Sequence, residues 1–311
     1  MKTTLQKKRS LFGITKKILL GAFGLTIISS CGEKEDGDSN EEKTKALVIT
    51  AIPDEKHSDQ EANYEVLRKY LADKLEIEVK FSTSSDYPAA VERFKNGEVH
   101  LVWFGGYTGV QARKAVPGSR AIAQGDVDPK YKSYFIAHKS TGLTKSDKFP
   151  AAIKDLTFTF GSKSSTSGRL MPTYFILKET GMMPDKYFTN PVQFQTVGGH
   201  DATARAVAGG SVQAGVLSYK KYDAMVADGE IKAEDAPIIW ETPDYADYNL
   251  TVHPVLDEMF GDGFIDKLQK VLVDCEDKDV LKAFLRDDLI PATNEEFEGI
   301  YEVAKELGMM R

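Results

Sequence analysis

The chain has 311 residues and a net charge of −7, and 28% of its residues are charged. Its first 17 residues hold six of the 40 basic residues and no acid, so the remainder carries 34 basic and 47 acidic residues, a net charge of −13. An acidic chain without a basic stripe is a poor partner for nucleic acid, and the length after residue 45 suits one large domain or two smaller ones.

The N-terminal residues have the pattern of an export signal. Basic residues at 2–17 precede an apolar run at 18–28, which is too short to span a bilayer. Ile28-Ser29-Ser30-Cys31 resembles the bacterial lipobox, whose Cys becomes the acylated first residue of the mature protein. We therefore expect a lipoprotein signal peptide at 1–30, lipidation at Cys31 and a flexible tether at 31–45. An uncleaved anchor is the alternative.

Cysteine and histidine give little sign of a metal or redox site. After Cys31 only Cys275 remains, so we expect no internal disulfide and a buried structural thiol. The histidines other than His200 have no metal-ligand spacing. They are His57, His100, His138 and His253. We predict neither metal nor cofactor.

The first part of the body alternates strands and helices. Predicted strands lie at 46–52, 77–81, 99–104, 119–124 and 132–138. Predicted helices lie at 60–75, 88–97 and 108–116. In the helix at 60–75, apolar residues such as Val66, Leu67 and Leu71 recur at helical spacing. This alternation indicates an α/β fold with a largely parallel sheet covered on both faces.

A second unit repeats the plan. Predicted strands lie at 157–160, 193–197, 212–217, 236–240 and 248–252. Predicted helices lie at 168–180, from 200 to about 209, and from 218 to 229. Residues 255–311 look mostly helical, with an apolar stripe that includes Phe264, Leu268 and Leu272.

Three strand-to-helix junctions of the second unit carry polar donors. In chain order the donors are Ser165, Thr166 and Ser167, then His200, then Ser218 and Tyr219. Such junctions lie at the carboxyl ends of the strands, where ligands bind in open α/β sheets. Helix N-termini at roughly half a charge each can hold an anion without Lys or Arg. Four or five charge-assisted hydrogen bonds of about 1.5–3 kcal/mol could supply micromolar affinity.

These stretches resemble a known family. Ser165-Thr166-Ser167-Gly168, Gly199-His200-Asp201-Ala202 and Trp103-Phe104-Gly105-Gly106-Tyr107 are similar to motifs of the phosphonate-binding family of ABC-transporter substrate-binding proteins. The resemblance covers nearly the whole mature chain. It implies that Ser165, Thr166, Ser167 and His200 grip the oxyanion and that Tyr107, after Gly106, closes over it. The amino-acid sequences of these motifs are most similar to those of a branch associated with selenate or a related oxyanion.

The family implies a two-lobed periplasmic-binding-protein fold of type II with the ligand cleft between the lobes. We expect lobe one at 46–135 plus 245–311 and lobe two at 140–240, with hinge crossings near 134–138 and 240–248. Closure would bury the anion and create the surface that a permease reads. The implied partners are a permease, its ATPase and the membrane that holds the lipid anchor, in the periplasm or on the outer face of the plasma membrane. We expect a monomer.

The expected ligand is a small tetrahedral oxyanion, either selenate or sulfate, or a phosphonate, phosphite or phosphate. The donors of lobe two favour a fully ionised anion such as selenate or sulfate over phosphate. We expect binding to hold up from roughly pH 6 to 8, or to tighten somewhat toward the acid end as His200 becomes charged. Tyr219 could also contact the ligand. Arg169 is expected to point to solvent and Asp201 to support its helix end. Asp54 and Asp86 follow strands of lobe one and could reach the cleft.

Two other classes remain open. An exported serine hydrolase would use Ser165 or Ser167 with His200 and an Asp, but no Gly-x-Ser-x-Gly elbow is present. A lipoprotein that only binds other proteins, with an empty cleft, is the other class. We expect a binding protein and not an enzyme.

Overall fold

The structure is a computed structural model that describes residues 45–195, 197 and 199–310. All of these residues belong to one compact unit of the chain, which begins at Thr44. The predicted signal peptide, the lipidation site Cys31 and nearly all of the predicted tether lie outside the described residues. In the described part of the chain, no helix is both long enough and apolar enough to cross a bilayer.

Six strands form the first sheet, in the order β11-β4-β10-β3-β1-β2. They are β1 (Ala46–Ala51), β2 (Glu78–Phe81), β3 (Leu101–Phe104), β4 (Arg120–Gly125), β10 (Asn249–Val252) and β11 (Leu289–Pro291). β1 runs parallel to β2 and β3, whereas β10 is antiparallel to β3 and β4, and β11 to β4. The sequence pattern predicted this part of the chain to be mostly helical. It missed β11 because a strand of three residues is too short to show an alternating pattern.

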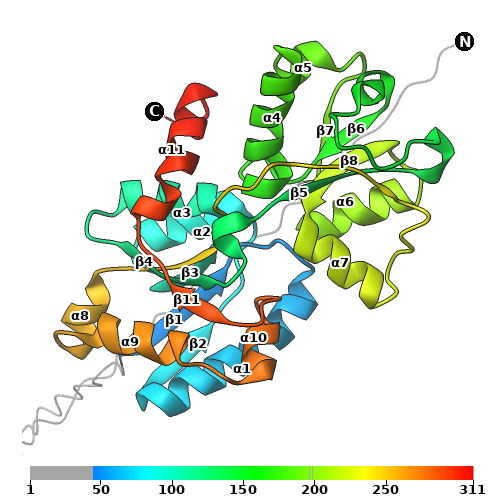
Figure 1. Cartoon of the computed structure of the whole chain (residues 1–311). Coiled ribbons are helices and arrows are strands. Elements are labelled where there is room, and N and C mark those ends of the chain that lie inside the picture. The colour runs from blue at the N-terminus through cyan, green and yellow to red at the C-terminus, as the bar shows by residue number, and fades with distance from the viewer. Residues whose placement is uncertain (1–44, 196, 198, 311) are drawn as a thin grey trace, which may run out of the picture. The chain divides into compact units, whose positions relative to one another are not determined.

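Helices cover both faces of this sheet (Figure 1). One layer contains α1 (His57–Leu75), α8 (Val255–Phe260), α9 (Phe264–Val273) and α10 (Lys278–Lys282). The other contains α2 (Tyr87–Lys95), α3 (Gly106–Ala115) and α11 (Glu298–Glu306). Because α11 packs on α3, the C-terminal end of the chain supports this helix.

Five strands form the second sheet, in the order β7-β6-β8-β5-β9. They are β5 (Ser133–Ala137), β6 (Phe158–Phe160), β7 (Gln193–Phe194), β8 (Ala214–Ser218) and β9 (Ile238–Glu241). The helices are α4 (Met171–Thr180), α5 (Pro184–Tyr187), α6 (Gly199–Ala208) and α7 (Tyr219–Ala227). Successive strand residues face opposite layers: Ile136 packs under α6 and α7, while Phe135 joins the core on the other face.

Short helical turns complete the chain. They are η1 (Asp128–Lys130), η2 (Lys139–Thr141), η3 (Ala151–Asp155), the π-helical turn η4 (Thr166–Leu170) and η5 (Glu295–Phe297). η4 leads directly into α4, so the strand, the hydroxyl-rich turn and the helix predicted from sequence are all present.

One strand lies in a different sheet from the one predicted. The sequence pattern placed residues 132–138 at the end of the first unit, but β5 is antiparallel to β8 and β9 in the second sheet. The chain therefore passes between the sheets after Gly125 and again after Glu241. A bridge between Tyr131 and Tyr245 joins the two crossing segments. Each sheet forms one lobe together with its helices.

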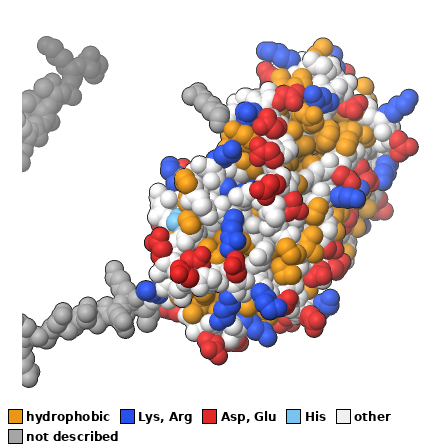
Figure 2. All heavy atoms as spheres, turned by 60° about the vertical axis from the view of Figure 1, so that its left-hand side comes forward, with side chains coloured by type: hydrophobic (Ala, Val, Ile, Leu, Met, Phe, Trp, Pro, Cys, Tyr) orange, Lys and Arg blue, Asp and Glu red, His pale blue; other side chains and the backbone are white. Residues whose placement is uncertain are grey.

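The surface charge is mixed. Figure 2 shows acidic and basic side chains interspersed over the face that it draws, without a continuous basic area.

Cys275 is buried, as predicted for a structural thiol.

Candidate functional site

The hydroxyl loop, Ser165 to Ser167, is buried where β6 leads into η4 and α4. Ser165 caps the helix, since its Oγ accepts a hydrogen bond from Gly168 N at 2.9 Å. Gly161 N donates to Gly168 O at 2.9 Å. A Cβ on Gly168 would lie 3.2 Å from Gly161 Cα and 2.9 Å from Ser165 Oγ. Glycine at 168 therefore lets the loop fold back tightly enough to present its hydroxyls.

The N-terminus of α3 faces this loop from the other lobe. Tyr107 N donates to Thr166 Oγ1 at 3.0 Å, and Gly106 N donates to Asp247 Oδ1 at 2.9 Å. The first amides of a helix have no partners within the helix and carry positive dipole charge. The two lobes thus bring a helix N-terminus, a hydroxyl loop and a carboxyl together.

The side chain of Tyr107 points elsewhere. Its hydroxyl donates to Met309 O at 2.7 Å, in the C-terminal segment after α11. The backbone amide of Tyr107 therefore bonds to the hydroxyl loop, while its side-chain hydroxyl ties α3 to the end of the chain.

His200 opens α6 and is fully buried. Its Nδ1 accepts a hydrogen bond from Ser218 N at 3.3 Å, so the ring proton belongs on Nε2. Nε2 lies 3.5 Å from Ser167 Oγ and 3.3 Å from Tyr248 Oη. Burial, followed by the charge of Lys221, lowers the pKa of His200 to about 3. The expectation that His200 charges as pH falls toward 6 is therefore wrong, since the imidazole stays a neutral donor.

Gly199 sets the position of His200. Its φ is +53°, and a Cβ there would overlap the backbone of Asp54. The same close approach lets His200 N donate to Asp54 O at 3.0 Å.

Asp247, in the second crossing segment, is the site residue that sequence reasoning missed. It is 1% exposed, and its Oδ2 has no hydrogen-bond partner among the described residues. Burial raises its pKa to about 7, although the Gly106 amide and the nearby hydroxyls of Thr166 and Ser167 oppose the shift. No local sequence pattern marks Asp247. Only the antiparallel pairing of β10 with β3, in which Asn249 pairs with Phe104, brings the residues just before β10 to the edge of the sheet where α3 begins.

Two other predicted residues lie apart from the hydroxyl loop. Tyr219 is half-buried, and its ring packs on Tyr131 and Tyr134 at centroid distances of 4.8 and 5.8 Å. Asp86 caps α2 by accepting from Ala89 N at 2.7 Å and does not turn toward the site. At the third junction it is the amide of Ser218, through His200, that serves the site.

Arg169 does not extend into solvent. Its guanidinium lies over the rings of Phe160 and Phe194, at 4.4 and 5.0 Å from their centroids. Burial lowers its pKa to about 10. The prediction failed because the aromatic edge of the β6–β7 sheet offers Arg169 a cation–π contact.

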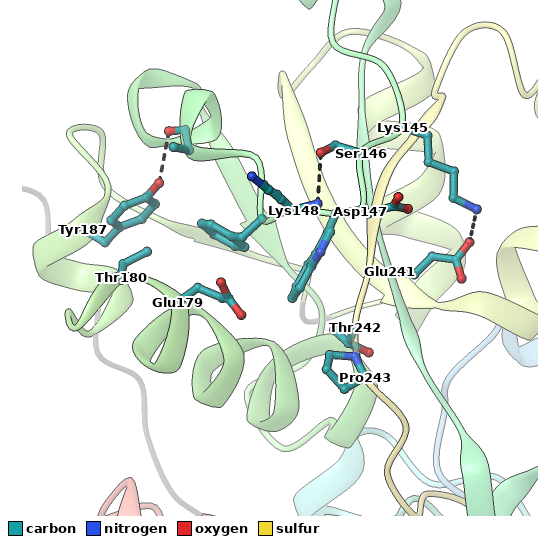
Figure 3. Close-up of a pocket in the computed structure, with 13 residues that line it drawn as sticks. Lys145, Ser146, Asp147, Lys148, Glu179, Thr180, Tyr187, Glu241, Thr242 and Pro243 are labelled. Carbon is teal, nitrogen blue, oxygen red and sulfur yellow. Dashed lines mark hydrogen bonds and ion pairs between the residues drawn. The ribbon is translucent and has the colours of Figure 1, made fainter.

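A cavity of about 20 Å³ lies beside two residues that contact His200. It is lined in part by Asp54, Tyr131, Ser218 and Tyr248, of which Ser218 and Tyr248 contact the imidazole. A much larger groove of about 890 Å³ lies elsewhere on lobe two (Figure 3). Its lining includes Trp240 and a partly exposed ion pair between Lys145 and Glu241. None of the buried donors around His200 and the hydroxyl loop line it.

The described residues that surround the hydroxyl loop therefore offer neutral donors and the carboxyl of Asp247 as an acceptor. Among the described residues no group of three His, Cys, Asp or Glu side chains could hold a metal ion. The chemistry available is capture of a small oxyanion by hydroxyls, amides and one imidazole N–H.

The comparisons with known proteins point to one family. A sequence model of the family described as "ABC transporter, phosphonate, periplasmic substrate-binding protein" matches residues 49–297. The chain is 34% identical over 274 residues to a probable ABC transporter phosphite binding protein, PhnD1, of Prochlorococcus marinus (strain MIT 9301), covering 86% of this chain and 91% of that protein. It is 26% identical over 310 residues to the phosphate-import protein PhnD of Mycolicibacterium smegmatis, covering 91% and 92%.

The structural likeness agrees. The structure matches that of P. marinus PhnD1 in complex with methylphosphonate with a TM-score of 0.79 at 34% identity, covering 85% of this chain and 98% of the other. This match confirms the predicted two-lobed α/β fold.

Proposed function

Since the chain belongs to the phosphonate-binding family of periplasmic ABC-transporter substrate-binding proteins, we propose that it captures a small phosphorus oxyanion that can share a proton. The family implies an extracytoplasmic location. Its members are substrate-binding proteins of transporters and not enzymes. The proposal concerns the ligand and the residues that hold it.

The observation that carries the proposal is the free oxygen of Asp247. This carboxyl is buried beside the Gly106 amide and the hydroxyls of Thr166 and Ser167. A buried carboxylate next to an oxyanion is repulsive unless one proton lies between them. The second pKa of a phosphoryl group is about 6, which is close to the pKa of about 7 for Asp247. Either group can then hold the proton, and a charge-assisted hydrogen bond forms.

Asp247 reverses the preference for selenate or sulfate that the sequence suggested. The oxygens of those anions are much weaker bases and share a proton poorly, so their bond to Asp247 is weaker. Phosphite, small phosphonates and phosphate are therefore the proposed ligands. The names of the relatives agree, since they specify phosphite, phosphate and methylphosphonate.

The size of the adjoining cavity favours the smallest of these anions. About 20 Å³ is the room of roughly one water molecule. A hydrogen or a methyl group on phosphorus suits this space better than a longer chain.

Ser165, Thr166, Ser167, the amides of Gly106 and Tyr107, and His200 Nε2 are the proposed donors. Some of these donors bond to one another in this structure, as Tyr107 N does to Thr166 Oγ1. An entering anion would exchange such contacts for charge-assisted ones of about 1.5–3 kcal/mol each. Four of them would support micromolar binding after association costs.

A hydrolase is not supported. In a Ser-His-Asp arrangement a carboxylate orients the imidazole, and the free nitrogen accepts the serine proton. Here Nδ1 of His200 accepts from a backbone amide, so Nε2 carries a proton and cannot act as the base for Ser167.

Delivery needs partners outside this chain. We propose that the closed lobes dock on a permease driven by an ATPase and that an acylated Cys31 holds the protein, as a monomer, near the membrane.

The test is calorimetry of the purified protein at pH 7 with phosphite, methylphosphonate, phosphate, sulfate and selenate. We expect phosphite or methylphosphonate to bind at least tenfold more tightly than sulfate and selenate. Equal or tighter binding of selenate would contradict the role given to Asp247.

A further inference from the structure

A buried cluster of charges joins the two lobes beside the proposed anion site. Lys221, in the first turn of α7, places Nζ 2.6 Å from Oε2 of Glu55, which follows β1 in the other lobe. The two side chains are only 12% and 11% exposed. The same ammonium lies 3.8 Å from Oδ1 of Asp201 in α6, and Asp54 is near enough to act on its charge. One ammonium therefore faces three carboxyls, named here the acidic cage: Asp54, Glu55 and Asp201.

The acidic cage has more negative charge than Lys221 can neutralise. Arg205 approaches the second oxygen of Asp201 at 3.6 Å, but its own side chain is one-third exposed. Oδ1 of Asp201 is buried and makes no hydrogen bond in the described part of the chain. Burial raises the pKa of Asp201, and it raises that of Asp54 to about 6. A cage of this kind binds an ammonium strongly.

The acidic cage opens on the small cavity next to His200. Asp54, Glu55 and Lys221 line that cavity together with Ser218 and Tyr248. Tyr248 Oη lies 3.3 Å from His200 Nε2, and Ser218 N donates to His200 Nδ1. A substituent on an anion held by His200 would therefore extend toward the cage.

Lys220 and Arg286 also line this cavity. Lys220 Nζ lies 6.0 Å from the centroid of the Tyr219 ring, and Arg286 is already neutralised. Arg286 forms a buried ion pair with Asp128, with Nη2 2.5 Å from Oδ1 and Nε 3.0 Å from Oδ2. It therefore does not offset the charge of the acidic cage.

We propose that Lys221 is a specificity-determining residue: its ammonium fills the acidic cage and so excludes oxyanions that carry an ammonium group of their own. This inference rests on the proposed function, because it needs an oxyanion in the neighbouring site. It goes further by stating which phosphonates the protein rejects and which side chain rejects them.

Lys221 could instead serve only to hold the lobes together, and the chain offers a control for that role. Lys178 in α4 and Glu306 in α11 form a second ion pair between the lobes, at 2.9 Å. This pair is about half exposed on both sides and lies away from the cavity, so it contributes little to stability.

The experiment is calorimetry at pH 7 with phosphite, ethylphosphonate and 2-aminoethylphosphonate. The last two share a two-carbon chain, and 2-aminoethylphosphonate carries an amine at the end of it. The unmodified protein should bind phosphite and should bind both longer ligands at least tenfold more weakly. Lys221→Ala empties the acidic cage, so 2-aminoethylphosphonate should then bind at least tenfold more tightly than ethylphosphonate.

Matched variants separate charge from space. Lys221→Met fills the same volume without charge and should not gain the amine ligand. Lys178→Ala should change none of the three affinities by more than about threefold. In Lys221→Ala, ethylammonium chloride should strengthen phosphite binding at least threefold, and in Lys221→Met it should not. If Lys221→Ala does not fold, Lys221→Ser, whose hydroxyl can bond the carboxylates, replaces it.

The inference is overturned if a folded Lys221→Ala or Lys221→Ser protein binds phosphite but does not distinguish the two longer ligands. Lys221 would then only join the lobes. Failure of the unmodified protein to bind phosphite, methylphosphonate or phosphate would instead overturn the proposed function, and this inference with it.

Discussion

Replacing Asp247 with Asn tests the proposed selection of a proton-sharing anion. The change keeps the size of the side chain and can keep an acceptor oxygen for Gly106 N, which donates to Oδ1 at 2.9 Å. The free Oδ2, which has no hydrogen-bond partner in the described residues, becomes an NH₂ group. The site therefore loses its only carboxyl acceptor and gains a donor.

The expected loss can be worked from one bond. A charge-assisted hydrogen bond contributes about 1.5–3 kcal/mol, and 1.4 kcal/mol corresponds to a factor of ten in affinity. Asp247→Asn should therefore weaken phosphite binding by about 10- to 100-fold. Sulfate and selenate lose a poor partner and gain an amide donor, so their affinity should stay within threefold or rise.

The assay is calorimetry at pH 7 with phosphite and sulfate on both proteins, with thermal unfolding as a check on the fold. Asp244→Asn is the matched control, because Asp244 lies in the same crossing segment and is exposed. It should leave both affinities unchanged. A phosphite loss below threefold in Asp247→Asn, or an equal loss for sulfate, would refute proton sharing as the basis of selection.

The same geometry and the N-terminal motif give three further predictions. Changing Ser165, Thr166 and Ser167 together to Ala should abolish anion binding in calorimetry while the far-ultraviolet circular dichroism stays native; affinity retained within about threefold would remove the hydroxyl loop from the site. The folded-state pKa of Asp247 is raised from 3.8 to about 7, so the folded protein holds this proton more tightly than the unfolded chain. The free energy of unfolding, measured by urea denaturation, should therefore fall as the pH rises from about 4 to 7, by roughly 4 kcal/mol at most. Asp247→Asn should flatten that pH dependence. Cys31→Ser should move the processed protein from the membrane to the soluble fraction, since each buried methylene of a lipid contributes about 0.8 kcal/mol; persistent membrane association would contradict the lipobox interpretation.

Local patterns predicted the parts of the site that depend on neighbouring residues. The hydroxyl loop was recognisable because β6, its turn and the following helix are contiguous in sequence. His200 was recognisable because a glycine and a helix start mark its position. Ser165 caps its helix through a hydrogen bond that spans three residues. Such features need no knowledge of the rest of the fold.

Features that depend on distant pairing were missed. Asp247 contacts the amide of Gly106, 141 residues earlier in the chain, so no local pattern reveals it. β5 has the composition of any buried strand, and only its pairing with β8, about 80 residues later, assigns it to the second sheet. The direction of the Tyr107 hydroxyl depends in the same way on Met309 at the end of the chain.

The proposed site would distinguish anions by whether they can share a proton, because its proposed donors include no cation. His200 is neutral, and the other proposed donors are hydroxyls and helix amides. Burying a Lys or Arg there would cost several kcal/mol of desolvation, and its charge would attract chloride or sulfate as readily as phosphite. Neutral donors favour any small oxyanion about equally, so the one carboxyl decides among them. Asp247 can do this because burial holds its pKa near 7, where an anion with a second pKa of about 6 can share the proton. The residue that looks least suited to an anion site is therefore the one that would give it specificity.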